Sequence, residues 1–118
     1  RIIIFTSKNN KKSKHLKKIG CELFVVKKQK DNQLNLNTIF KKIFELKIND
    51  ILIEAGGIFF THLLKKKLVD ELHLFKAPFN IGKKGKPFIV DMNLKDIKFK
   101  EVLTKKFKND IYHYLKIN

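Results

Sequence analysis

Short apolar runs that alternate with segments of helical spacing constrain the fold of this chain more than any other feature. The runs lie at residues 2–6, 21–26, 51–55 and 69–78. The first, "IIIFT", is a continuous β-branched and aromatic run, which is typical of a strand buried on both faces. Because strands that alternate with helices need crossover connections, we expect a three-layer α/β fold with a mainly parallel sheet flanked by helices.

Three segments between and after these runs have the spacing of amphipathic helices. Gly20 is placed as the C-terminal stop of the first helix. Apolar residues at positions 36, 39, 40, 43 and 44 predict the second helix, with Asn35 or Asn37 as its N-cap. Gly56 and Gly57 open the third, which ends in three consecutive lysines that suit the negative end of a helix dipole.

The C-terminal part has a different pattern. Residues 98–107 and 109–117 alternate in the manner of antiparallel strands with one wet face, so we predict a C-terminal antiparallel pair. With no internal repeat and no linker, residues 1–118 are expected to form a single domain. Arg1 stands directly before the first strand without an initiator Met, so we also expect an N-terminally truncated domain.

Cysteine content and hydropathy indicate where in the cell the protein is expected. The single cysteine, Cys21, fits a reducing environment and favours a cytoplasmic protein. No apolar run approaches the roughly 20 residues that span a bilayer, so a membrane protein is not expected.

The net charge of +16 suggests a nucleic-acid-binding protein at first sight. However, Arg1 is the one arginine among 27 basic residues, and planar bidentate recognition of phosphate or guanine is mostly arginine chemistry. Abundant Lys, Ile, Asn and Phe together indicate a compositional bias with a lysine-rich solvated surface. A lysine-rich nucleic-acid-binding module is therefore disfavoured, and we keep it as an alternative.

Residues 50–62, "DILIEAGGIFFTH", carry the main candidate site. Glu54 and the pair Gly56 and Gly57 lie where the predicted third strand turns into a helix. Adjacent glycines let a ligand approach the backbone, and a helix N-terminus favours a phosphate. A purely structural turn accounts for the glycines equally well. The four histidines show no metal-ligand spacing, so no metal is predicted, and no nucleophilic triad can be argued.

The stretch from residue 50 to residue 90 resembles the C-terminal half of the riboflavin-biosynthesis reductase domain of the bifunctional deaminase-reductase family, which has a dihydrofolate-reductase-like fold. The elements that carry the resemblance are "IEAGG", "LVDEL", "LFKAP" and "NIGKKG", in the family's order and at close spacing. The family's first half, with its opening strand and substrate-phosphate residues, has no counterpart here. The zinc deaminase signatures are also absent.

The resemblance implies an NADPH-dependent reductase that converts the ribosyl group of 5-amino-6-(5-phosphoribosylamino)uracil to ribityl, and a homodimer. A noncatalytic nucleotide-binding fragment remains an alternative. By position, Glu54 corresponds to a substrate-binding carboxylate, and a bulky residue at Gly57 is expected to weaken NADPH binding. No general acid can be named. The segment implied to bind NADPH consists of Gly56, Gly57, Ile58, Phe59, Phe60, Thr61 and His62.

Overall fold

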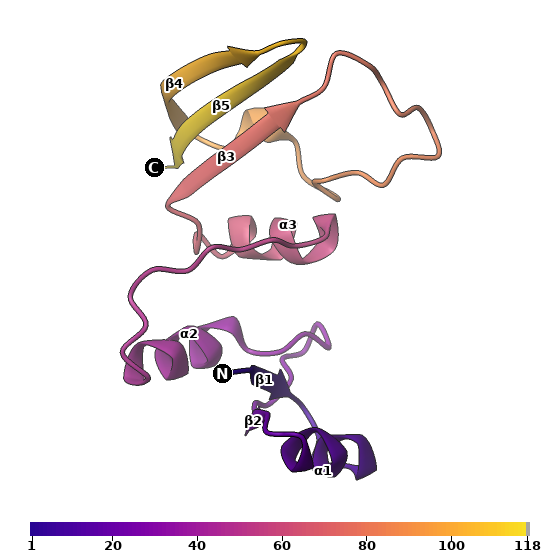
Figure 1. Ribbon diagram of the computed structural model, residues 1–118, viewed down its shortest axis with the longest axis vertical. Helices are drawn as coiled ribbons and strands as arrows, with labels where there is room; N and C mark the ends of the chain where they lie inside the picture. Colours follow the sequence, from indigo (N-terminus) through magenta and orange to yellow (C-terminus); the bar gives the residue numbers. More distant parts are fainter. Residues whose placement is uncertain (118) are drawn as a thin grey trace. The chain divides into compact units, whose positions relative to one another are not determined.

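The computed structural model describes residues 1–117, which form two compact units. One unit is Arg1–Leu52, and the other begins at Ile53. Each unit contains its own small sheet, and Figure 1 follows the chain through both.

The first unit is built on a parallel strand pair. Strand β1 (Ile3–Thr6) pairs with β2 (Glu22–Val25), and helix α1 (Lys11–Lys18) connects them. The predicted strands at 2–6 and 21–26 are therefore confirmed. The start of α1 is fixed by a capping box, in which Oδ1 of Asn10 accepts the backbone N–H of Ser13 at 3.0 Å and Oγ of Ser13 accepts that of Asn10 at 3.3 Å.

Helix α2 (Leu36–Glu45) completes the first unit. Its N-cap is Asn35, whose side chain accepts the Thr38 N–H at 3.1 Å, which decides between the two predicted caps. Gly20 has a φ of 92°, in the left-handed region, as expected of the residue that stops α1. The buried apolar residues described in this unit are Cys21, Val26 and Leu36.

The second unit contains an antiparallel sheet. Helix α3 (Gly57–Lys65) precedes strand β3 (Glu71–Lys76), and the short 3-10 helix η1 (Leu94–Asp96) precedes β4 (Phe99–Phe107) and β5 (Asp110–Ile117). The strand order is β3-β5-β4. The predicted C-terminal antiparallel pair is confirmed. The fourth predicted strand joins this pair antiparallel, so β1 and β2 supply the parallel pairing among the described residues.

The prediction of a strand at residues 51–55 is wrong, because these residues form no strand in the structure. The side chains of Ile51 and Leu52 are exposed, Leu52 to 82%. An apolar run becomes a strand only where another strand pairs with its backbone, and no strand described within residues 1–117 does so here.

The core of the second unit lies between α3 and one face of the sheet. Leu63 is fully buried, and Leu115 on the central strand β5 is nearly so. Along β3, half-buried Leu72 and Leu74 alternate with exposed residues, which is the period of a strand with one covered face. Figure 1 shows α3 lying beside β3. The exposed face of the sheet therefore carries the odd-numbered residues of β3.

Candidate functional site

The start of α3 is the centre of the predicted site. Gly56 is the N-cap, with φ −70° and ψ 158°, and no described side chain caps this end. The Phe60 N–H donates to the Gly56 carbonyl at 3.0 Å, so the N–H groups before it have no carbonyl partner within the helix. No atom lies within 4 Å of the place where a Cβ of Gly56 would stand. This helix end can therefore accept an anionic group from outside, which fits a phosphorylated cofactor.

Glu54 lies two residues before the N-cap and is exposed. Its carboxylate makes no hydrogen bond or ion pair with any residue described between 1 and 117. A carboxylate two residues before an uncapped helix N-terminus gives this short segment two different preferences: the helix end attracts anions, and Glu54 attracts hydroxyl and N–H donors.

Gly57 has a different environment from Gly56. A Cβ at position 57 would collide with the carbonyl oxygen of Pro87 and would lie 3.1 Å from the carbonyl carbon of Phe88. The loop backbone therefore occupies the space that the absent side chain leaves. A bulky residue at Gly57 would therefore displace the backbone of Pro87 and Phe88, in addition to any effect on NADPH binding.

Thr61 is buried and fixes the same loop. Its Oγ1 donates a hydrogen bond to the carbonyl of Gly57 at 2.7 Å and accepts one from the N–H of Val90 at 2.8 Å. One hydroxyl thus uses its donor and a lone pair at once. Sequence reasoning placed Thr61 in the segment that wraps the cofactor, and no pattern in the sequence pointed to its partner Val90.

The other residues of the segment divide by exposure. Ile58 is 71% exposed and Phe59 46%, so both side chains are accessible beside the N-cap. The ring of Phe60 stacks on that of Phe88, with centroids 6.3 Å apart, and adds a second contact to the loop. The Nε2 atom of His62 is buried and has no hydrogen-bond partner among the described residues.

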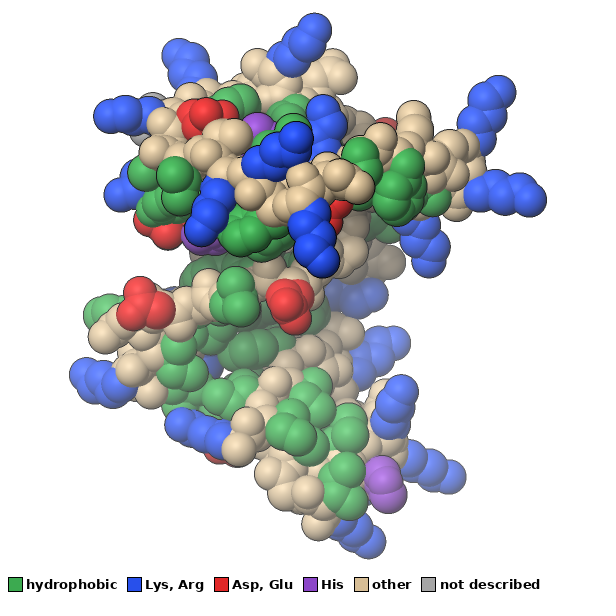
Figure 2. All heavy atoms as spheres, turned by 45° about the horizontal axis from the view of Figure 1, so that its top comes forward, with side chains coloured by type: hydrophobic (Ala, Val, Ile, Leu, Met, Phe, Trp, Pro, Cys, Tyr) green, Lys and Arg blue, Asp and Glu red, His purple; other side chains and the backbone are tan. Residues whose placement is uncertain are grey.

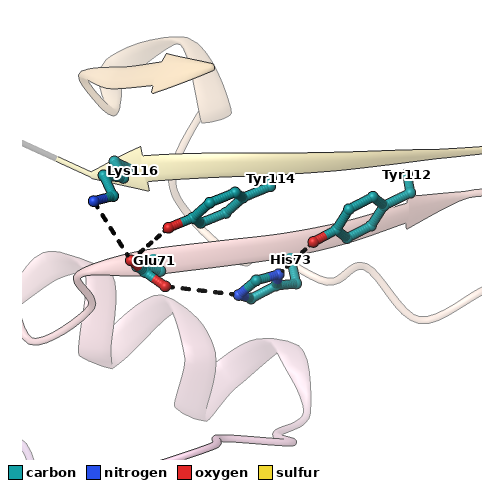
Figure 3. Close-up of polar contacts among 5 residues, drawn as sticks. All are labelled: Glu71, His73, Tyr112, Tyr114 and Lys116. Atoms are coloured by element: carbon teal, nitrogen blue, oxygen red, sulfur yellow. Dashed lines mark hydrogen bonds and ion pairs between the residues drawn. The ribbon is translucent and has the colours of Figure 1, made fainter. Parts of the chain in front are cut away.

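A polar and aromatic cluster lies on the exposed face of the sheet (Figure 3). The Tyr114 hydroxyl donates to Oε1 of Glu71 at 2.6 Å, and this hydrogen bond to a carboxylate raises the pKa of Tyr114 above its ordinary value. The His73 ring stacks on Tyr114 at 4.9 Å, and its Nδ1 lies 2.7 Å from the Tyr112 hydroxyl. Nζ of Lys116 on β5 lies 3.8 Å from Oε1 of Glu71 on β3, so the two side chains form an ion pair across the strands.

Sequence reasoning did not predict this cluster. The signal was the alternation in "ELHLF" and "IYHYL", which places Glu71 and His73 on one face of β3 and Tyr112 and Tyr114 on one face of β5. The alternation does not show which residue of β3 lies opposite which residue of β5. The pairing of His73 with Tyr114 brings the two sets together.

Basic side chains are spread out on the surface. Figure 2 shows Lys and Arg side chains projecting singly from the visible face, with apolar side chains exposed between them. Within the described residues, no group of three or more His, Cys, Asp or Glu side chains is arranged to hold a metal ion. None of the helices found between residues 1 and 117 has the length and apolar character needed to cross a membrane.

Two curated relatives are similar to this chain in sequence. The chain is 32% identical over 85 residues to the 5-amino-6-(5-phosphoribosylamino)uracil reductase of Buchnera aphidicola subsp. Acyrthosiphon pisum, a match that covers 72% of this chain and 40% of the relative. It is 34% identical over 80 residues to the riboflavin biosynthesis protein RibD of Aquifex aeolicus, covering 68% and 21%. The chain thus spans less than half the length of these curated relatives.

Solved structures share the fold. Acinetobacter baumannii RibD, form 2, superposes with a TM-score of 0.79 at 20% identity, over 98% of this chain and 31% of that one. A pyrimidine reductase-like protein from Corynebacterium diphtheriae gives 0.78 at 20% identity, over 98% and 50%. The expected dihydrofolate-reductase-like α/β fold is confirmed by this similarity together with the described elements.

The family itself follows from a match to a family model. The model described as the RibD C-terminal domain matches residues 1–113, which include the first compact unit, most of the second, Glu54 and residues 56–62. The resemblance carried by "IEAGG", "LVDEL" and "LFKAP" is therefore confirmed, and the chain belongs to the RibD C-terminal domain family.

Proposed function

We propose that this chain forms part of an NADPH-dependent reductase of riboflavin biosynthesis, which reduces the ribosyl group of 5-amino-6-(5-phosphoribosylamino)uracil to ribityl. One observation carries the proposal: the uncapped, open N-terminus of α3 at Gly56 lies two residues from the exposed carboxylate of Glu54. Family membership and the name of the Buchnera relative, a 5-amino-6-(5-phosphoribosylamino)uracil reductase, support the reaction and the substrate. We further propose that both compact units belong to one reductase domain.

NADPH would supply the hydride for this reduction. The residues of this chain bind and orient the reactants. The free N–H groups at the start of α3 suit a phosphate of the cofactor, and exposed Ile58 and Phe59 offer apolar surface beside it. Glu54 accepts hydrogen bonds from substrate hydroxyl or N–H groups. This division gives the dinucleotide and the sugar-bearing substrate separate partners, which aligns the two for reaction.

Gly56→Asp tests the cofactor assignment. Aspartate is a good N-cap and places a negative charge at a helix N-terminus, so it should leave stability unchanged or raise it by about 0.3–1 kcal/mol. The same carboxylate occupies the anion site and repels a phosphate, so we expect NADPH to bind at least about tenfold more weakly. Isothermal titration calorimetry with the folded wild-type and Gly56→Asp chains measures the Kd for NADPH.

Gly56→Asn is the matched control, because it has nearly the same shape and capping ability without the charge. We expect it to weaken NADPH binding less than Gly56→Asp does. Equal NADPH affinity in the wild type and Gly56→Asp would contradict the assignment of the cofactor to this helix end.

Glu54→Gln tests the substrate assignment. Loss of the charge should raise the KM for the phosphoribosylaminopyrimidine about tenfold or more and leave NADPH affinity within about twofold, since a hydrogen bond to a charged group contributes about 1.5–3 kcal/mol. Glu101→Gln on β4 removes the same charge elsewhere and should change neither value. A Glu54→Gln enzyme with unaltered KM would remove the substrate role.

We also propose a cytoplasmic homodimer. The support for the dimer is strand β4, which lies at the edge of its sheet with all nine residues exposed, among them Phe99, Val102, Leu103 and Phe107. Exposed apolar side chains on a strand edge that no described strand pairs with favour association with a second copy. The lone cysteine, Cys21, supports the cytoplasm, and recovery of the protein in another cell fraction would contradict this location.

A further inference from the structure

We infer that Thr61 is a positioning residue of the reductase: it holds the Pro87–Val90 backbone against the first turn of α3 and so sets the shape of the cofactor site without touching the cofactor. This inference rests on the proposed function. It replaces the direct cofactor contact that the resemblance implies for Thr61 with an indirect role, and it adds residues 87–90 to the site.

Burial separates Thr61 from its neighbours in the segment. Its relative exposure is 3%, whereas Ile58 and Phe59 on the same helix are exposed to 71% and 46%. A cofactor that approaches the open N-cap meets exposed groups first. The Thr61 hydroxyl also uses its one donor and one of its lone pairs on protein partners, because it donates to the Gly57 carbonyl and accepts from the Val90 N–H.

Three independent contacts join the helix start to this loop. Thr61 bonds the Val90 N–H at 2.8 Å, the Phe60 ring stacks on Phe88, and Gly57 admits the Pro87 carbonyl where a Cβ would stand. The Thr61 bond is the directional one of the three, so it fixes where the loop backbone stands along the helix. The open N–H groups of the first turn and the loop therefore keep one relative geometry.

Loss of the hydroxyl should loosen this geometry without removing bulk. Thr61→Val preserves the shape and branching of the side chain but leaves the Val90 N–H without its acceptor. Thr61→Ser keeps the hydroxyl and loses a methyl group. If Thr61 acts by positioning, the serine variant restores function and the valine variant does not.

The experiment compares the wild type, Thr61→Val and Thr61→Ser under conditions in which circular dichroism shows each to be folded. We expect Thr61→Val to raise the Kd for NADPH about tenfold and to speed exchange of the Val90 amide hydrogen. Thr61→Ser should keep both within about twofold of the wild type. Ser13→Ala removes a different buried hydroxyl, which bonds within residues 8–13, and should leave the Kd unchanged.

Two outcomes would overturn the inference. A folded Thr61→Val protein with the wild-type Kd for NADPH excludes a positioning role, and unchanged exchange of the Val90 amide excludes the contact on which that role depends. If the proposed function is wrong, the wild type itself will bind no NADPH. The inferred effect of Thr61 on the cofactor site is then wrong too, and exchange of the Val90 amide alone shows whether Thr61 holds the loop.

Discussion

The carbonyl oxygen of Pro87 lies where the Cβ of any larger residue at Gly57 would have to stand. Gly57→Ala should therefore destabilise the fold, because overpacking forces the backbone of residues 87–88 away from α3, at a cost of about 1–3 kcal/mol. Gly56→Ala is the matched control, since open space surrounds that position, and it should cost no more than about 1 kcal/mol. Urea denaturation measures the free energy of unfolding of both variants. Equal stabilities would contradict the close approach of the Pro87 carbonyl to Gly57.

Leu63 should contribute more to stability than any exposed residue of α3. Leu63→Ala removes a fully buried side chain and leaves a cavity, so we expect a loss of about 2–5 kcal/mol in the free energy of unfolding. Ile58→Ala shortens an aliphatic side chain on the same helix at an exposed position and should change stability by about 0.5 kcal/mol or less. The prediction is wrong if denaturant midpoints shift equally in the two proteins.

The hydrogen bond from Tyr114 to Glu71 should make stability depend on alkaline pH. Because the carboxylate raises the pKa of Tyr114 in the folded state, its contribution is fully present below the ordinary phenol pKa of about 10 and is lost as the pH rises through the folded-state pKa. Denaturation midpoints of the wild type measured across this range should fall more steeply than those of Tyr114→Phe.

Glu71→Gln provides the control for this effect. It replaces the carboxylate, whose hydrogen bond and charge both raise the Tyr114 pKa, with a neutral and weaker acceptor in the same place. Spectrophotometric titration should then show Tyr114 ionising at lower pH than in the wild type. An unchanged ionisation curve would show that Glu71 is not the cause.

The homodimer proposal predicts that a charge on β4 separates the subunits. Leu103→Lys places an ammonium group on the exposed apolar edge strand, where its desolvation opposes association. Light scattering coupled to gel filtration should show a dimer for the wild type and a monomer for the variant. Phe44→Lys substitutes another exposed apolar residue, on α2, and should remain dimeric; a wild-type monomer at all accessible concentrations would refute the proposal.

Local patterns predicted most elements of this fold. The continuous run "IIIFT", the helical spacing after Leu36 and the alternation in "IYHYL" each depend on residues only a few positions apart, and each corresponds to an observed element. The pattern failed at residues 51–55, where apolar character was right for a strand but the outcome depended on a pairing partner. The antiparallel direction of β3 also depended on a partner. That partner is β5, which follows β3 by more than 30 residues, so no local pattern specifies the pairing.

The candidate site divides in the same way. The open helix start at Gly56 and the nearby Glu54 were readable from "IEAGG", because the turn and the helix lie in consecutive residues. The partners of Gly57 and Thr61 were not, because Pro87 and Val90 lie on a loop whose path is set by β3 and by packing. Three of the seven residues that the resemblance assigned to the cofactor thus have observed partners on this loop: Gly57 meets the Pro87 backbone, Phe60 stacks on Phe88, and Thr61 bonds Val90.

The β3-β5-β4 order also determines when the second sheet can form. Thr104 meets His113 nine residues later across the β4–β5 hairpin, whereas Glu71 waits for Tyr114, 43 residues later. Closing the longer loop costs about 1.4 kcal/mol more in chain entropy, so we expect the hairpin to nucleate folding and β3 to dock afterwards. Mutations in the hairpin should slow folding more than mutations in β3. On the ribosome, β3 therefore has no strand to pair with until β5 has been made.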